Sequence, residues 1–206
     1  MLSPILRMTQ TATIAALLLA LPTLPVAAQQ AGEVLAAKGE CFVDSAGRRS
    51  ALTIGAAVQV GDTVDVPDGA KLKLRMVDGS VLSAASGTRV TIESYVAEPR
   101  DAKLALASGL LRAVVAKAGQ PSHFEVDTAT GVAAVRSTDW FIRVESEGTQ
   151  VGVLDGKVSL ASAATHRAVE IPARWGARVE AGRNPVPPRV WSQAEFDDVI
   201  GRTNLD

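Results

Sequence analysis

The stretch Gly61–Tyr95, GDTVDVPDGAKLKLRMVDGSVLSAASGTRVTIESY, is the most informative part of this chain for its fold class. Over residues 71–76 the letters KLKLRM alternate basic and apolar side chains. A period of two is typical of a β-strand that buries one face and leaves the other in water. The Asp-Gly pairs at 68–69 and 78–79 supply residues that tolerate the positive φ angles of tight turns. The stretch therefore predicts short strands joined by tight turns, with the basic side chains exposed.

Outside this stretch, turn residues recur about every eight to twelve positions, a spacing typical of all-β sandwiches, barrels and solenoids. A first strand pair is expected over residues 32–43 and a last pair over residues 169–180. Only 4% of the residues are aromatic, so the core must consist mainly of Val, Leu, Ile and Ala. The chain is predicted to be all-β up to about residue 182.

The C-terminal part begins with a Pro-rich segment at 184–188, which predicts a stiff, extended linker. A helix is predicted to follow, because Ser192 can cap its first turn while the Glu195 side chain reaches back to the cap. Trp191, just before the cap, can contact Phe196 across it. These residues predict a short α-helix after Ser192.

This helix carries an apolar stripe, because Phe196, Val199 and Ile200 recur at helical spacing. A helix of two to three turns is not stable alone in water. It must therefore pack on something, either the β-domain of the same chain or a partner. The sequence leaves both alternatives open.

The N-terminal residues 1–28 are predicted to be a signal peptide. Arg7 precedes a short apolar run at 14–21, and small residues at 26–28 are typical of a cleavage site. The mature chain is expected to start at Gln29 and to reach the periplasm or the medium of a bacterium, most simply a Gram-negative one. No stable membrane insertion is expected after processing.

The charge balance argues against a nucleic-acid partner. The chain has 21 Lys and Arg against 22 Asp and Glu. Residues 1–28 hold one base, Arg7, and no acid, so the mature part has 20 bases against 22 acids, a net charge of −2. Binding to nucleic acid needs a concentrated basic surface, which this balance does not suggest. It also predicts no broad attraction to anionic lipid.

Several motifs occur in an order that is informative when they are taken together. They are a GD pair and DG turn at 61–80, LALASGLLR at 104–112, FEVDT at 124–128, AVRSTDWF at 134–141 and VGVLDGKV at 151–158. In this order and spacing the chain resembles the FecR-type domain of bacterial envelope proteins, from about Gly32 to Gly182. The resemblance implies a β-solenoid or β-roll of short rungs, with a short C-terminal helix added here.

Two differences from the family pattern are visible. Ser137 stands where the family usually has Gly, so a positive-φ turn at this point would be strained or changed. Many FecR-type proteins are signal transducers with a cytoplasmic anti-sigma segment and one membrane span. Neither is expected in this chain, so its sequence does not predict a transmembrane signalling role.

The segment RSTDWF at 136–141 is the best candidate for an interaction surface, because it combines a guanidinium, hydroxyls and two large aromatic rings. With the aromatic residues of the C-terminal helix, the candidate interaction residues are Arg136, Thr138, Trp140, Phe141, Trp191 and Phe196. The alternative is that Trp140 or Phe141 packs inward as scaffold. Arg136 would then pair with a carboxylate such as Asp139 or Asp155.

No group of residues predicts catalysis, a cofactor or a metal. His123, Glu125 and Asp127 share one face of a strand, but their side chains diverge instead of converging on an ion. His166 has no companion, and no nucleophile elbow or phosphate-binding loop is present. Cys41, the only cysteine, is expected to be a buried small side chain; a reactive thiol or an intermolecular bridge is the alternative.

The sequence therefore predicts an exported, non-enzymatic FecR-type protein that acts as an interaction or sensory module of the cell envelope. The expected organisation is a signal peptide at 1–28, a β-domain at 29–182, and a linker with an amphipathic helix at 183–206. The expected partner is an envelope protein or a polysaccharide. The alternative is a carbohydrate-binding or structural envelope protein that contacts peptidoglycan or exopolysaccharide through exposed Trp residues.

Overall fold

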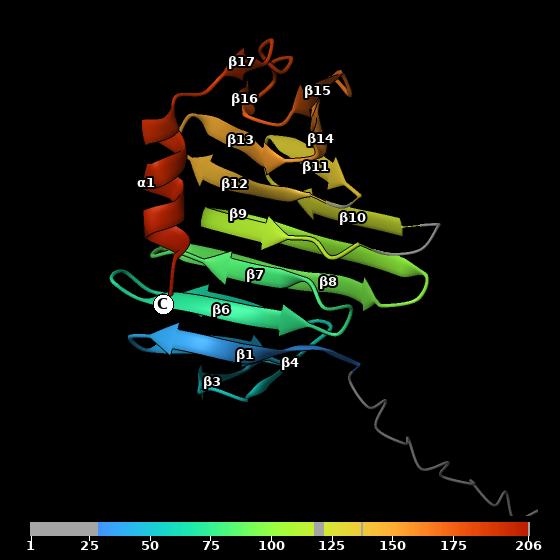
Figure 1. Cartoon of the computed structure of the whole chain (residues 1–206). Helices are drawn as coiled ribbons and strands as arrows, with labels where there is room; N and C mark the ends of the chain where they lie inside the picture. The colour runs from blue at the N-terminus through green and yellow to red at the C-terminus, as the bar shows by residue number, and fades with distance from the viewer. Residues whose placement is uncertain (1–28, 118–121, 137, 206) are drawn as a thin grey trace, which may run out of the picture.

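The computed structural model describes residues 29–117, 122–136 and 138–205 (Figure 1). The described residues form seventeen strands and one helix. The predicted signal peptide lies outside them. The elements are β1 Gln30–Lys38, β2 Cys41–Ser45, β3 Arg48–Leu52, β4 Ala57–Gln59, β5 Thr63–Val66, β6 Lys71–Met76, β7 Val81–Ala84, β8 Thr88–Val96, β9 Arg100–Val114, β10 Ser122–Asp127, β11 Gly131–Val135, β12 Asp139–Glu145, β13 Gly148–Asp155, β14 Lys157–Ser162, β15 Ala168–Pro172, β16 Trp175–Glu180, β17 Arg189–Val190 and α1 Gln193–Thr203.

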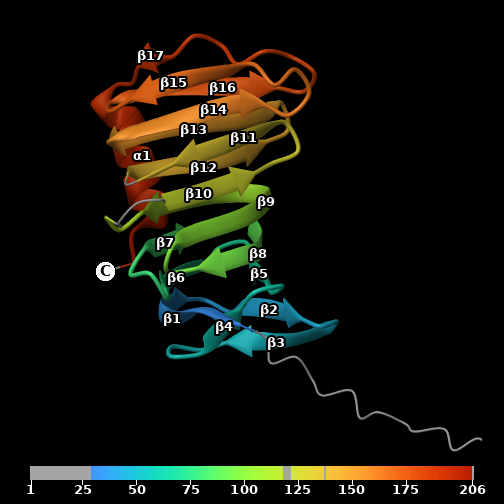
Figure 2. The same cartoon turned by 90° about the vertical axis from the view of Figure 1, so that its right-hand side faces the viewer.

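The strands stack in two layers that share one long strand (Figure 2). Layer A has the order β4-β1-β6-β7-β9-β12-β13-β16-β17, and layer B has the order β3-β2-β5-β8-β9-β10-β11-β14-β15. Strand β9 pairs with β8 in layer B up to Ser108, and with β12 in layer A from Gly109. All seventeen strands therefore belong to one open sheet.

The change of layer within β9 depends on Gly109. Its φ angle is 89°, a conformation that glycine adopts without steric cost. A Cβ atom at this position would lie 2.4 Å from the Cα atom of Thr88, so any larger residue would clash with the neighbouring strand. The glycine thus allows the chain to pass from one layer to the other next to β8.

The core lies between the two layers and is filled from both. Its largest fully buried side chains include Trp140, Tyr95, Phe124, Leu72, Leu104 and Ile92. The rings of Tyr95 and Phe124 meet edge to face, with their centroids 6.3 Å apart. The rest of the core is mostly Val, Leu, Ile and Ala, as the low aromatic content predicts. The prediction of an all-β chain with one short C-terminal helix is confirmed.

Strand β6 confirms the predicted register of the KLKLRM segment, since its three apolar side chains are buried. The prediction that all its basic side chains are exposed needs a correction. Of the three, Arg75 is exposed, whereas Lys71 and Lys73 are half-buried. The Lys71 Nζ donates to the carbonyls of Gly201 and Asn204 at 2.8 and 3.2 Å. A cation at a helix C-terminus satisfies carbonyls that lack intrahelical partners. Lys71 therefore ties the end of α1 to layer A.

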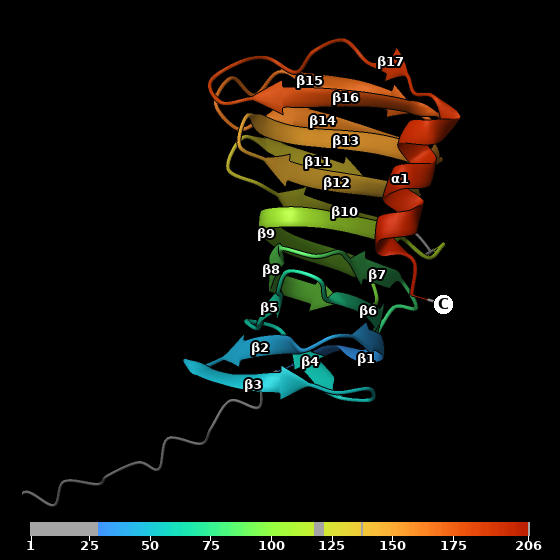
Figure 3. The same cartoon turned by 90° about the vertical axis from the view of Figure 1, so that its left-hand side faces the viewer.

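Helix α1 stands upright beside the stack and runs across the strands of layer A (Figures 1 and 3). Its predicted capping box is present: Ser192 accepts from the Glu195 backbone N–H, and the Glu195 carboxylate accepts from the Ser192 N–H at 2.8 Å. The helix packs on the same chain, which decides between the two alternatives that the sequence left open. Its apolar cluster joins Ala85, Leu110, Phe141, Trp191, Phe196 and Val199.

The surface of layer A is shaped to receive this cluster. A Cβ atom added to Gly176 would lie 2.1 Å from Nε1 of the Trp191 indole, so only glycine leaves room for that ring. The rings of Phe141 and Trp191 lie 5.2 Å apart, and those of Trp191 and Phe196 lie 5.6 Å apart. The helix is thus held by a packed aromatic cluster.

The cap of α1 should make its docking sensitive to acid. Hydrogen bonds from Arg189 and from the Ser192 backbone lower the pKa of Glu195 to about 2. A carboxyl with a lowered folded-state pKa stabilises the fold above its unfolded pKa of about 4.3, and this contribution is lost as the pH falls toward the folded value. We expect the stability difference between the native chain and Glu195→Gln to shrink between about pH 4.5 and 2. Urea unfolding followed by tryptophan fluorescence measures it, and a constant difference would contradict the role of the cap.

Cys41 is fully buried in the core, as the first of its two alternatives predicts, and its Sγ lies 3.6 Å from the carbonyl oxygen of Lys71. Burial, followed by the nearby Asp65 carboxylate, raises the pKa of the thiol above its ordinary value. The reactive species is the thiolate, so both effects disfavour reaction. We expect no reaction with a maleimide in the folded protein and complete reaction in urea, measured by intact mass. Rapid labelling of the folded protein would instead support the alternative of a reactive thiol.

Candidate functional site

The structure distributes the six predicted interaction residues over different environments. Trp140 points into the core between the layers and is fully buried. Phe141, its neighbour on β12, points to the opposite side and is fully buried beneath α1 with Trp191 and Phe196. The four aromatic side chains therefore have packing roles in this structure. Trp140 and Phe141 fit the alternative in which they pack inward, and Trp191 and Phe196 fit the alternative in which the helix packs on its own chain.

Arg136 is the exposed member of the set. Asp139, one carboxylate proposed to pair with it, instead accepts two hydrogen bonds from Arg112, from Nε at 2.9 Å and from Nη2 at 2.7 Å. This pairing raises the pKa of the Arg112 guanidinium above its ordinary value. Arg136 makes no hydrogen bond or ion pair with any other residue that the structure describes.

Arg136 lines an open depression of about 610 Å³, which we term the Arg136 groove. The groove lies on the side of layer B that faces away from the core, where β10, β11, β14 and β15 are neighbours. Its lining includes His123, Ala134, Arg136, Lys157, Ser159 and Glu170. Thr138 closes one end; it is buried, and its Oγ1 donates to the Lys157 carbonyl at 3.2 Å.

Strand register brings the basic residues of the groove together. Phe124 on β10 faces Val135 on β11, and Val135 faces Val158 on β14. His123 comes just before Phe124, Arg136 just after Val135, and Lys157 just before Val158. These three residues therefore form one row across the three neighbouring strands. Small side chains, Ala134 and Ser159, face each other in the next row and form the floor of the groove.

The described residues of the groove include one exposed ion pair. The Lys157 Nζ lies 3.2 Å from the Glu170 carboxylate, and both side chains are mostly in solvent. An exposed pair of this kind contributes little to stability, so its members are free to exchange partners. Beside the groove, the His123 Nε2 lies 3.4 Å from the Glu125 carboxylate.

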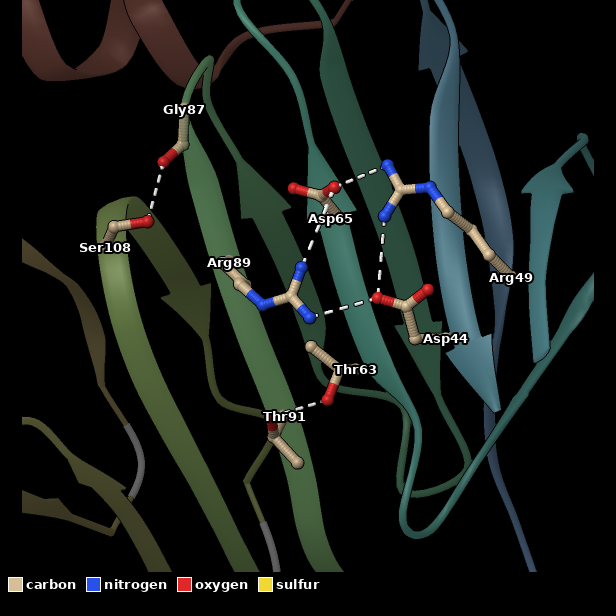
Figure 4. A network of polar contacts seen from close by, with 8 residues as sticks. All are labelled: Asp44, Arg49, Thr63, Asp65, Gly87, Arg89, Thr91 and Ser108. Carbon is tan, nitrogen blue, oxygen red and sulfur yellow. Dashed lines mark hydrogen bonds and ion pairs between the residues drawn. The ribbon is translucent and has the colours of Figure 1, made fainter. Parts of the chain in front are cut away.

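Elsewhere the outer face of layer B is densely paired (Figure 4). Arg49 lies 2.6 Å from Asp65 and 3.5 Å from Asp44, and Arg89 bridges the same two carboxylates at 3.8 and 3.0 Å. This network of two arginines and two aspartates joins β2, β3, β5 and β8. Each arginine in the network contacts both aspartates, and the positive and negative charges are equal in number. The network therefore has a structural role.

A second paired group lies between this network and the Arg136 groove. The Lys103 Nζ on β9 lies 2.9 Å from Asp127, 3.4 Å from Glu125 and 3.8 Å from Glu93. Its hydrogen bond with Asp127 raises the pKa of the Lys103 ammonium above its ordinary value. His123, Glu125 and Asp127 do share one face of β10, and the two carboxylates face this ammonium.

One polar group was not predicted from the sequence. Asp78 and Arg100 form an ion pair in which both side chains are almost fully buried. The Tyr95 hydroxyl donates to Asp78 at 2.9 Å, and the Arg100 Nη1 donates to the Ala116 carbonyl at 2.5 Å. Burial and the neighbouring carboxylate raise the pKa of Tyr95 well above its ordinary value, so the phenol stays protonated and donates. The Asp78-Gly79 pair predicts only a turn, which is why this group was missed.

Comparison with known families identifies the domain. Residues 62–159 match the model of the family described as FecR protein. The chain carries a FecR domain. The match runs from just before β5 into β14 and includes most of the Arg136 groove, with Arg136 and Lys157 but without Glu170. It confirms the resemblance that the sequence motifs suggest over its central part.

Solved structures similar to this FecR-domain chain include two crystal structures of a candidate anti-sigma factor from Parabacteroides distasonis, at 1.65 and 2.50 Å resolution. Each has a TM-score of 0.55 and 16% sequence identity, and each alignment covers 66% of this chain and 62% of the other. At this identity the likeness shows a shared fold. The chain spans less than two thirds of the length of that protein, and no curated protein matches it.

Proposed function

We propose that this protein is an exported, non-enzymatic module of the bacterial envelope that acts in sensing or regulation by binding a protein partner. The FecR domain at 62–159 carries the proposal. The similar fold of a candidate anti-sigma factor supports a regulatory role. Among the described residues, no helix has the length and apolar character needed to cross a membrane. We propose that the folded FecR domain itself recognises the partner.

We further propose that the β-domain at 29–182 is a β-roll, because short strand pairs stack in two layers around one narrow core (Figure 2). We assign residues 183–206 to the C-terminal segment. This segment contacts the β-domain along its length, since the Val186 N–H donates to the Arg178 carbonyl at 2.9 Å and α1 packs on layer A.

The burial of the Trp residues disfavours the alternative of a carbohydrate-binding protein. Such binding would use a flat row of exposed aromatic rings. Trp140 is fully buried and Trp191 is 5% exposed, which leaves only Trp175, at 36%, partly in solvent. One partly exposed Trp does not form a row, so a protein partner is the better supported choice.

Export predicts a defined mature N-terminus. The basic residue Arg7, the apolar run and the small residues at 26–28 predict cleavage before Gln29. We expect the protein purified from the periplasm or medium of its own bacterium to have the intact mass of residues 29–206. A membrane fraction that retains the first 28 residues would contradict export of a soluble mature chain.

Site-directed photo-crosslinking in living cells tests the proposed binding of a protein. A photoreactive amino acid is placed at one exposed position at a time: Arg48 on β3, Lys157 at the Arg136 groove or Arg202 on α1. We expect at least one position to give a single discrete protein adduct in the envelope, identified by mass spectrometry. Adducts at none of the positions, or adducts only to glycan, would contradict the proposed function.

A further inference from the structure

We propose that the Arg136 groove binds carboxylates of an acidic, extended peptide segment. This inference rests on the proposed function, because it specifies the chemistry by which the groove would meet a protein partner. It depends on three observations: an arginine that pairs with none of the other described residues, a second cation in the same row, and a floor of small side chains.

The first observation is the state of the Arg136 guanidinium. It is exposed and makes no ion pair or hydrogen bond with another described residue. By contrast, Arg49 and Arg89 on the same face of layer B are each engaged by two aspartates. A planar guanidinium binds a carboxylate through two parallel hydrogen bonds, which makes arginine the most suitable side chain for this ligand. Arg136 is therefore available to an external carboxylate.

The second observation is the position of Lys157. It lies on the strand next to Arg136, so the two backbones are about 4.8 Å apart. Acidic side chains at positions i and i+2 of an extended peptide lie about 7 Å apart, within reach of these two long side chains. Among the described residues, the Lys157 ammonium pairs with the exposed carboxylate of Glu170, which a carboxylate of the ligand can replace. His123 extends the row on the other side and adds positive charge when protonated.

The third observation is the floor of the groove. Ala134 and Ser159 are small, so a peptide backbone can approach the sheet closely between the cations and Glu170. The groove crosses four strands, β10, β11, β14 and β15, a width of about 14 Å. An extended segment covers about 3.3 Å per residue, so four to five residues fit across the groove.

Binding of a defined probe tests the inference. The probe is fluorescein-labelled hexaglutamate, with hexaglutamine as its uncharged counterpart, added to the mature full chain at low ionic strength. We expect saturable binding of hexaglutamate only. Arg136→Gln should weaken it about tenfold, because a charge-assisted bidentate contact is lost. Lys157→Gln should weaken it several-fold, and added salt should weaken it further.

A matched control separates a site from general attraction. Arg167 is also an exposed arginine; it lies in the loop before β15 and is not part of the groove. Arg167→Gln should change the affinity for hexaglutamate by less than about twofold. When hexaglutamate is added to the native chain, the amide chemical shifts of residues 134–136 and 157–159 should change. Equal losses in Arg136→Gln and Arg167→Gln, equal binding of hexaglutamine, or no saturable binding would each overturn the inference.

Two further outcomes are informative. Tighter binding of polygalacturonate than of hexaglutamate would also overturn the inference, because it would point to an anionic polysaccharide. Unchanged thermal unfolding of Arg136→Gln shows that lost binding is not lost folding. If the probe fails while photo-crosslinking still captures one envelope protein, the groove assignment fails and the proposed function stands.

Discussion

Replacing Phe196 with alanine should lower the free energy of unfolding by about 3–5 kcal/mol, the range for a fully buried phenylalanine. Phe196 has no exposed surface in the structure. Its ring lies 6.4 Å from that of Phe141 and 5.6 Å from that of Trp191, measured between centroids, and the guanidinium of Arg174 lies 4.5 Å above it. Removing the ring leaves a cavity under α1 that the rigid layer A cannot fill.

Chemical unfolding of the mature chain measures this loss. Asp197→Ala is the matched control, because Asp197 is the exposed neighbour on the same helix and its removal should cost less than about 0.5 kcal/mol. The near-ultraviolet circular dichroism of Phe196→Ala should also change, since Trp191 loses a packed partner. Equal stability of the two variants would mean that α1 does not dock on its own β-domain in solution.

The features that the sequence predicted correctly depend on local spacing. The alternation in KLKLRM fixes which side chains of β6 are buried, because successive residues of a strand point to opposite faces. The capping box needs only Ser192 and Glu195, three residues apart. The FecR motifs likewise combine short patterns in a fixed order, and the family match confirms them. None of these predictions required knowledge of strand order.

The features that it could not predict depend on contacts between distant residues. Trp140 and Phe141 are consecutive on β12, so the strand period indicates that they point to opposite sides. Trp140 is buried in the core between the layers, and Phe141, on the opposite side, is buried because α1 docks over it. The bond from Lys71 to the end of α1 joins residues 130 and 133 positions apart. The Arg136 groove depends in the same way on the register of β10, β11 and β14, which are neighbours in layer B although β14 does not follow β11 in the sequence.

The buried ion pair of Asp78 and Arg100 is the other place where a single substitution should have a large effect. Its side chains are 2% and 1% exposed. Asp78 also accepts hydrogen bonds from the Ser80 backbone N–H at 3.0 Å, from the Ser80 hydroxyl at 2.8 Å and from the Tyr95 hydroxyl at 2.9 Å. The group thereby joins the β6–β7 turn to β8 and to the start of β9. Both charged side chains are thus almost fully shielded from solvent and face each other.

Arg100→Met should lower the free energy of unfolding by about 3–5 kcal/mol, because it leaves the Asp78 carboxylate buried without a counter-charge. The matched control is Arg75→Met on β6, where the same substitution removes an exposed pair with Glu33 and should cost no more than about 1 kcal/mol.

The double variant Asp78→Asn with Arg100→Met distinguishes the buried charge from lost packing. It removes both charges but keeps an acceptor for Tyr95 and Ser80, so it should be more stable than Arg100→Met alone. Urea unfolding of the native chain, of Asp78→Asn, of Arg100→Met and of the double variant gives the coupling free energy between the two side chains. If the losses of unfolding free energy in the two single variants add up to the loss in the double variant, the two charges are not coupled in solution. In that case the ion pair does not hold the β6–β7 turn against β9.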